Sequence, residues 1–283
     1  MPKIHPMAFV DPGASLADDV VVGPFAYIGP GVTLAKGCVL HHHAQIEGNT
    51  TAGENNEFFP NCLIGAVSQD LKYRGGNCRV VIGRDNTFRE NSTVHIGTED
   101  GGNETRIGNK NLIMVGVHIA HDCVIGSNCI FANNVLLAGH VLVQDWVVIS
   151  GAAGSHHYVT FGQHCFVGGL SGITRDVPPF MVVEGGDAKV RAVNTKGLAR
   201  RGFSDEQIAC LKTAYRLLFR DTTPMATQVV ELEKLYPKNR EIETLLAFVR
   251  ESTNGRFGRA RENLRRKTSR DEGDEPPPHV SGN

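Results

Sequence analysis

Residues 111–131 concentrate side chains that can do chemistry. His118 and His121 lie three residues apart, Asp122 follows the second histidine, and Cys123 and Cys129 come after it. Histidine and cysteine together can bind zinc, whereas a histidine beside a carboxylate can act as a general base near neutral pH. A zinc site needs its thiolates and imidazoles to converge on one point, while a base needs one accessible ring nitrogen. The elements that position these side chains therefore decide between the two chemistries.

A six-residue repeat of large apolar side chains runs through most of the chain. It includes Val10, Leu16, Val22, Ile28, Leu34, Leu40 and Ile46 and, after a one-residue slip, Ile107, Ile113, Ile119, Ile125, Phe131, Leu137 and Val143. The residue two positions earlier is mostly small, and residues two apart on an extended segment point the same way. This period predicts a parallel β-helix built from hexapeptides. The pattern resembles that of the left-handed β-helix acyltransferases, in which three hexapeptides make one triangular coil of 18 residues.

The cysteines fit this repeat as core residues. Five of the seven fall in its small, inward-facing position: Cys38, Cys62, Cys123, Cys129 and Cys165. A thiol in such a place behaves as a small hydrophobe, so we expect no metal site. The N-terminal residues show no apolar segment typical of a signal peptide, which favours free thiols in a reducing cytoplasm.

The charge balance and hydropathy limit the partners. The 283 residues include 29 basic and 30 acidic side chains, which argues against nucleic acid as the main partner. No run of about 18 uncharged apolar residues occurs, so we expect no membrane span.

The repeat predicts which residues become neighbours in space. Successive coils stack at about 4.8 Å, so residues 18 apart lie one above the other. From His121 this step leads to Gly139, and from Asp122 it leads to His140. Gly139 has no side chain, so a substrate carbonyl can reach its backbone N–H, as an oxyanion site requires. Four histidines should gather on this edge of the prism: His121, His140, His156 and His157.

Two segments depart from the repeat. Residues 66–79 place Asp70 and Gly76 where aliphatic side chains belong, and residues 96–106 form a second departure. Loops on a rigid scaffold often bear binding residues. Because Gln69, Asp70 and Lys72 cluster in the first loop, we expect it to bind substrate.

A small helical domain follows the repeat. We expect the β-helix domain to span 1–190, a helical domain 191–258, and a disordered tail 259–283, which has few apolar residues. Ser204 and Gln207 form a capping box for one helix. A second helix should begin near Thr223 with Pro224 in its first position, and a third should span roughly 238–251.

Five motifs resemble the UDP-N-acetylglucosamine O-acyltransferase family, over about residues 8–258. They are "QDLKY" at 69–73, "HIAHDC" at 118–123, "LAGHV" at 137–141, "RDVPP" at 175–179 and "RRGFS" at 200–204. The resemblance implies transfer of an (R)-3-hydroxyacyl group from acyl carrier protein to the 3-hydroxyl of UDP-N-acetylglucosamine, the first step of lipid A biosynthesis. It also implies a homotrimer with sites between subunits, no cofactor and no metal.

The resemblance assigns roles to particular residues. His121 would be the general base, Asp122 would support it, and the Gly139 N–H would stabilise the oxyanion. Substrate contacts would come from Gln69, Asp70, Lys72, His118, His140, His156, His157, Asn194, Arg200 and Arg201. Phe166 and Gly169 lie where the family measures acyl length; Gly169 leaves room for a longer chain, whereas Phe166 favours a shorter one.

Several alternatives stay open at the level of sequence. The family commonly has an arginine where Ile96 stands, a glutamine at His157 and an acidic residue at Lys196. These departures leave open a 3-amino sugar acceptor, which would give an amide. Other readings are an acetyl-CoA-dependent acetyltransferase, an inactive paralogue, and a β-helix like the γ-carbonic anhydrases, which hold zinc with three histidines from adjacent coils.

Overall fold

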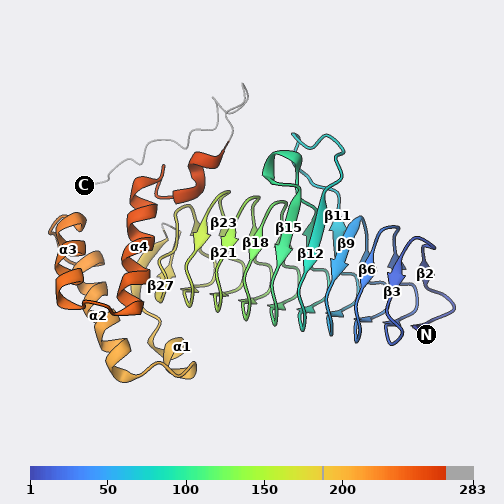
Figure 1. The fold of residues 1–283 in the computed structure, drawn as a ribbon, viewed down its shortest axis with the longest axis horizontal. Helices are drawn as coiled ribbons and strands as arrows, with labels where there is room; N and C mark the ends of the chain where they lie inside the picture. The colour runs from blue at the N-terminus through green and yellow to red at the C-terminus, as the bar shows by residue number, and fades with distance from the viewer. Residues whose placement is uncertain (187, 266–283) are drawn as a thin grey trace.

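The chain winds into a triangular prism of stacked coils. A computed structural model describes residues 1–186 and 188–265. Up to β26, successive strands join three sheets in turn, and from β4 onward each pairs in parallel with the strand three before it. Figure 1 shows the prism lying lengthwise, with the helices at its C-terminal end. The predicted left-handed parallel β-helix followed by helices is confirmed.

The three faces of the prism are named sheets A, B and C. Sheet A contains β1 (Lys3–Ile4), β4 (Val21–Val22), β7 (Val39–Leu40), β10 (Glu57–Phe58), β13 (Thr87–Phe88), β16 (Leu112–Ile113), β19 (Ile130–Phe131), β22 (Val148–Ile149), β25 (Phe166–Val167), β27 (Met181–Glu184) and β28 (Lys189–Val193). Sheet B contains β2 (Phe9–Val10), β5 (Tyr27–Ile28), β8 (Gln45–Ile46), β11 (Leu63–Ala66), β14 (Thr93–His95), β17 (His118–Ile119), β20 (Leu136–Leu137), β23 (Gly154–Ser155) and β26 (Gly172–Ile173). Sheet C contains β3 (Ser15–Leu16), β6 (Thr33–Leu34), β9 (Asn49–Ala52), β12 (Arg79–Ile82), β15 (Glu104–Ile107), β18 (Val124–Ile125), β21 (Leu142–Val143) and β24 (Thr160–Phe161).

The inward side chains fill the prism as the repeat predicts. Large residues of the series such as Phe58, Phe131 and Ile149 fill the interior and are at most 1% exposed, whereas Val10 and Leu16 in the first coil are partly exposed. The five cysteines in the small position are completely buried, and all seven cysteines are free. Burial raises the pKa of the Cys123 and Cys129 thiols to about 12, so they stay protonated and pack as apolar groups.

Buried asparagines replace the small apolar residue in three coils. Asn86 donates from its side chain to Oδ1 of Asn56 at 2.9 Å, and its own Oδ1 accepts the backbone N–H of Asn111 at 2.9 Å. All three are at most 2% exposed. The stacked amides satisfy one another and the turn carbonyls, which removes the cost of burying polar groups.

The two departures from the repeat are loops that leave the wall. Residues 67–78 connect β11 to β12, so Asn49 of β9 pairs with Arg79 across an enlarged coil. The second loop, between β14 and β15, contains the 3₁₀ helix η1 (Glu99–Gly101). Glu99 ties the loops together, because its carboxylate accepts the backbone N–H of Gly76 at 2.8 Å. Figure 1 shows both loops projecting from one edge of the prism.

The helical region closes the C-terminal end of the prism. It comprises α1 (Thr195–Arg200), α2 (Asp205–Phe219), α3 (Met225–Leu235) and α4 (Arg240–Asn254). The Ser204–Gln207 capping box is present, while Pro224 is the N-cap of α3 rather than its first residue. Strand β28 runs antiparallel to β27 and supports α2. The domain boundaries at 190 and 258 stay predictions. Within the described residues, no helix is long and apolar enough to cross a membrane.

The start of the expected disordered tail is ordered. Residues 260–264 form the 3₁₀ helix η2 (Ala260–Leu264), and Arg259 is 3% exposed. Its guanidinium donates to the Thr174 carbonyl at 2.6 Å and to Glu262 at 2.8 Å. The sequence-based expectation was wrong here because polar contacts, rather than apolar side chains, hold the segment. The rest of the predicted tail, 266–283, lies outside the described residues.

Candidate active site

A cavity of about 990 Å³ lies over sheet B, beneath the two loops. Its floor comes from successive coils at β17, β20, β23 and β26, and one wall comes from residues 69–72. Leu264 and Arg265 complete another wall. His121 and Gly139 both line the cavity, so the coil register brings together the residues that the sequence singled out.

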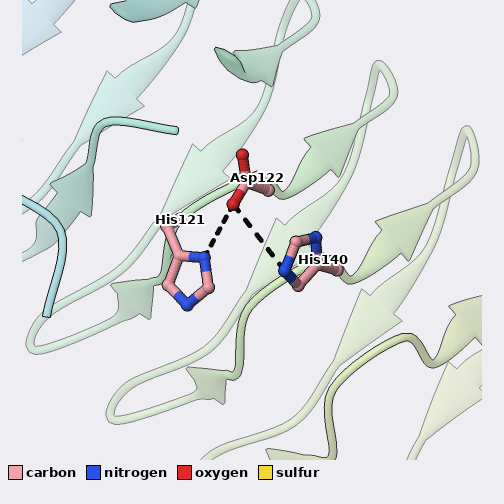
Figure 2. A group of neighbouring side chains, drawn as sticks. All are labelled: His121, Asp122 and His140. Carbon is pink, nitrogen blue, oxygen red and sulfur yellow. Dashed lines mark hydrogen bonds and ion pairs between the residues drawn. The ribbon is translucent and has the colours of Figure 1, made fainter. Parts of the chain in front are cut away.

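A histidine–carboxylate pair forms the chemical centre of the cavity. The Nδ1 atom of His121 lies 2.8 Å from Oδ2 of Asp122, and His140 Nε2 lies 3.8 Å from the same oxygen (Figure 2). The carboxylate accepts the Nδ1 proton, which leaves Nε2 of His121 as the nitrogen without a proton. That Nε2 lies 3.9 Å from Oδ2 of Asp70.

Asp122 is held rigidly by the second loop. Its Oδ1 accepts the Thr98 backbone N–H at 2.8 Å, and its Oδ2 accepts the Thr98 hydroxyl at 2.7 Å. The Asp122 backbone N–H donates to the Thr105 hydroxyl at 2.8 Å. The residue stands on a corner of the coil with φ 59°, a left-handed conformation that aspartate tolerates well. These bonds orient the carboxylate toward His121.

Gly139 lies directly against the ring of His121. A Cβ added at Gly139 would lie 2.4 Å from Cε1 and 2.5 Å from Nε2 of that ring. Within the described residues, the Gly139 backbone N–H has no protein acceptor. A donor beside a general base is the arrangement that stabilises a tetrahedral oxyanion.

Two histidines beside His121, His118 and His140, are neutral at physiological pH. Burial lowers the pKa of His118 to about 4, with His95 and His121 adding to the shift. Burial also lowers the pKa of His140 to about 4, against the opposing charge of Asp122. Neutral rings can donate or accept hydrogen bonds with hydroxyl groups without adding charge to the site.

His121, Asp122 and His140 also form the one three-residue group among the described residues that is close enough to hold a metal ion. Their ligand atoms lie within 4.8 Å of one another. Both oxygens of Asp122 already accept hydrogen bonds from Thr98, and Oδ2 accepts a third from His121. Binding of zinc would have to break this network, so the chemistry of the group favours a base and its orienting carboxylate. The expectation of no metal stays a prediction.

Most of the predicted substrate-binding residues line the cavity. They are Gln69, Asp70, Lys72, His118, His140, His156 and His157. Asp70 is oriented by its own loop, because its Oδ1 accepts the Lys72 backbone N–H at 2.9 Å.

The other predicted residues lie outside this cavity. Asn194 caps α1 by accepting from the Gly197 N–H and donates to the His164 carbonyl at 2.9 Å. Arg201 lies beside His164, over the ring of Trp146. Arg200 is exposed on the same helix. Phe166 lies in β25 of sheet A and Gly169 in the turn after it, so neither faces this cavity.

Several site residues escaped sequence reasoning. His95 and Thr98 line the cavity, and His95 packs edge-on against His118 with ring centroids 5.0 Å apart. Both lie where the enlarged coils break the 18-residue register, so the vertical-neighbour rule could not find them. Ile96 is 5% exposed and packs in the prism core. Leu264 and Arg265 were missed because they belong to the segment expected to be disordered.

Comparison with known families places the fold and site in a class. A family model described as bacterial transferase hexapeptide (six repeats) matches residues 104–139. With the β-helix and the His121–Asp122 pair over a cavity, this match indicates a hexapeptide-repeat transferase. A second model, described as Udp N-acetylglucosamine O-acyltransferase, Domain 2, matches residues 176–257.

Solved structures identify the family. LpxA from Acinetobacter baumannii is 39% identical, with a TM-score of 0.83 over 86% of this chain and 95% of that one. LpxA from Bacteroides fragilis, a UDP-N-acetylglucosamine acyltransferase, is 33% identical, with a TM-score of 0.85 over 87% and 96%. The Arabidopsis UDP-N-acetylglucosamine acyltransferase is 34% identical, with a TM-score of 0.80 over 89% and 98%. The chain therefore belongs to the UDP-N-acetylglucosamine O-acyltransferase family.

Proposed function

We propose that this protein transfers an (R)-3-hydroxyacyl group from acyl carrier protein to the 3-hydroxyl of UDP-N-acetylglucosamine, the first step of lipid A biosynthesis. Family membership supports the acceptor and the type of reaction. The observation that carries the mechanism is the 2.8 Å contact between His121 Nδ1 and Asp122, which leaves Nε2 available at the cavity.

His121 acts as the general base in this reaction. Its Nε2 takes the proton of the sugar 3-hydroxyl, and the oxygen attacks the thioester carbonyl carbon. The carbonyl oxygen becomes an oxyanion, which the Gly139 N–H stabilises. The intermediate collapses by breaking the carbon–sulfur bond, and the imidazolium of His121 returns its proton to the departing thiolate. Asp122 stabilises that imidazolium while it exists, because its carboxylate lies 2.8 Å from Nδ1.

A homotrimer would complete the site. Arg200 and Arg201 lie outside the cavity of their own chain, at the C-terminal end of α1. In a trimer they would serve the cavity of a neighbouring subunit and bind the nucleotide diphosphate, for which the arginine fork is suited. Asn194 holds the first turn of α1 and so positions both arginines. Phe166 and Gly169 would face the acyl chain across the same contact. Leu136, 54% exposed on sheet B, provides apolar surface for such a contact.

The cytoplasm is the compartment that we propose. All seven cysteines are free and buried. Free thiols persist in a reducing compartment.

The test is an acyl-transfer assay of the wild type and His121→Ala. Loss of a general base should lower kcat by roughly 10²–10⁴-fold. His41→Ala is the matched control, because His41 is paired with Glu57 and lies outside the cavity. Transfer that survives in His121→Ala at the wild-type rate would refute the role of His121.

The same assay distinguishes the acceptors and donors. A panel of acyl-chain lengths, run with UDP-N-acetylglucosamine and with its 3-amino analogue, measures kcat/KM for each pair. A higher kcat/KM for the 3-amino sugar would show that the enzyme forms an amide rather than an ester at this site. Absence of transfer to either sugar from every donor would overturn the proposed function.

A further inference from the structure

Residues 259–265, here called the strap, begin two residues after the family match ends at residue 257. The strap lies across the corner of the prism beside the cavity. The Ala260 N–H donates to Asp176 Oδ2 at 2.7 Å, and Arg261 donates to the His140 carbonyl at 2.6 Å. His140 and Asp176 belong to different coils of the same edge, so the strap bridges coils next to the histidine cluster.

Buried polar contacts hold the strap in one defined position. Arg259 and Glu262 form an ion pair at 2.8 Å and are 3% and 4% exposed. Burying charged groups is costly unless they are paired and hydrogen-bonded, and here they are both. Arg259 also donates to the Thr174 carbonyl at 2.6 Å. These bonds define where the residues that follow Glu262 must lie.

Arg265 is the residue that the strap brings to the cavity. It lines the cavity wall with Leu264. Its guanidinium lies 3.5 Å from Glu262 Oε1, and its side chain is 25% exposed. Burial raises the pKa of Tyr158, and the nearby charge of Arg265 opposes that shift. Arg265 and Tyr158 line the same cavity, and the Tyr158 ring stacks on His140 with ring centroids 4.4 Å apart.

The cavity needs permanent positive charge if it binds phosphate groups. His118 and His140 are neutral at physiological pH, because burial lowers the pKa of each to about 4. Two aspartates, Asp70 and Asp100, also line the cavity. Among the described residues of the lining, the lysines and arginines are Lys72 and Arg265. Arg265 thus supplies a large part of the positive charge that a phosphate would meet.

We propose that Arg265 is a further substrate-binding residue, which pairs with a phosphate group of a substrate, and that the strap positions it. This inference rests on the proposed function for the identity of the substrates. Two sources of phosphate are present in that reaction: the diphosphate of the nucleotide sugar and the phosphodiester of the carrier protein's prosthetic arm. An arginine can bind either through two parallel hydrogen bonds.

The experiment compares Arg265→Ala, Arg265→Lys and the control Arg256→Ala. Arg256 is exposed, lies over the Phe257 ring and is outside the cavity. KM for each substrate is measured with the other saturating, at several salt concentrations. Arg265→Ala should raise one KM by about tenfold, the loss expected for one charge-assisted hydrogen bond, and should leave kcat within about twofold. Arg265→Lys should recover part of the loss, and Arg256→Ala should match the wild type.

The two KM values identify the source of the phosphate. A rise for the nucleotide sugar assigns Arg265 to the diphosphate, and a rise for the donor assigns it to the prosthetic arm. Unchanged KM values for both substrates would overturn the proposal. The salt dependence of the affected KM should also become shallower in Arg265→Ala, because one ionic contact is lost.

A binding measurement separates this proposal from the proposed function. If the wild type shows no acyl transfer, the proposed function fails, and calorimetric titration with inorganic pyrophosphate then tests Arg265 directly. Weaker pyrophosphate binding by Arg265→Ala than by the wild type and Arg256→Ala supports the proposal. Equal binding by all three, or no binding by the wild type, refutes it.

Discussion

Gly139→Ala should slow the enzyme because the added Cβ would displace the His121 ring by about 1 Å. The added Cβ would lie 2.4 Å from Cε1 and 2.5 Å from Nε2 of His121, whereas ordinary contacts of a Cβ begin near 3.4 Å. The ring must therefore retreat by roughly 1 Å, and a displacement of that size costs about 10²-fold in rate. The ring cannot retreat freely, because its Nδ1 is held by Asp122 at 2.8 Å. Gly139 does not have a positive φ, so the backbone itself accepts alanine.

The assay measures kcat and thermal unfolding of Gly139→Ala beside Gly29→Ala. Gly29 lies in an early coil, and a Cβ there would make only ordinary contacts, the nearest at 3.4 Å to Tyr27. We expect Gly139→Ala to lose about 10²-fold in kcat while it remains folded, and Gly29→Ala to keep the wild-type rate. A Gly139→Ala enzyme with wild-type kcat would show that the His121 ring position does not limit the reaction, which would refute the reasoning.

Three further predictions follow from the same geometry. Asp122→Asn keeps a side chain that tolerates φ 59° but loses one hydrogen-bond acceptor. We expect kcat to fall about 10²-fold or more, and the free energy of unfolding measured in urea to fall by ~1–3 kcal/mol. An unchanged kcat would contradict the supporting role of the carboxylate. Acidification should destabilise the fold. Histidines of the unfolded chain bind protons near pH 6.5, whereas folded His118 and His140 bind them only near pH 4, so Tm should fall as the pH is lowered from 6.5 to 4. Part of this loss should be offset, because burial raises the pKa of Asp176 to about 6; a flat Tm across that window contradicts the burial of neutral histidines. Treatment with a chelator should leave activity unchanged, and stoichiometric zinc whose removal abolishes activity would favour a metal centre instead.

The six-residue repeat is why the centre of the site could be predicted from sequence. Once three hexapeptides make one coil, a step of 18 residues is a step up the prism. The structure pairs Leu136 with His118 and Gly154 with Leu136 in this register, which places Gly139 over His121. The repeat also places Cys123 in its small, inward-facing position, which is why this cysteine is completely buried and unavailable to a metal.

The repeat could not place residues where it is interrupted. Thr98 reaches Asp122 only because a loop enlarges the coil, and loop conformation depends on contacts such as that of Glu99 with Gly76. Sequence also did not specify which nitrogen of His121 bonds to Asp122, because that depends on the ring orientation set by packing against Gly139.

The sequence by itself determined the β-helix, its register, the buried cysteines and the pairing of His121 with Gly139. These follow from contacts between equivalent positions of neighbouring repeats, which a periodic pattern records directly. Only the tertiary structure decided the position of the strap. Arg259 and Arg261 donate hydrogen bonds to the carbonyls of Thr174 and His140, which are far away in the chain. Those bonds join groups that share no periodicity, and polar contacts of that kind leave no hydrophobic pattern for the sequence to display.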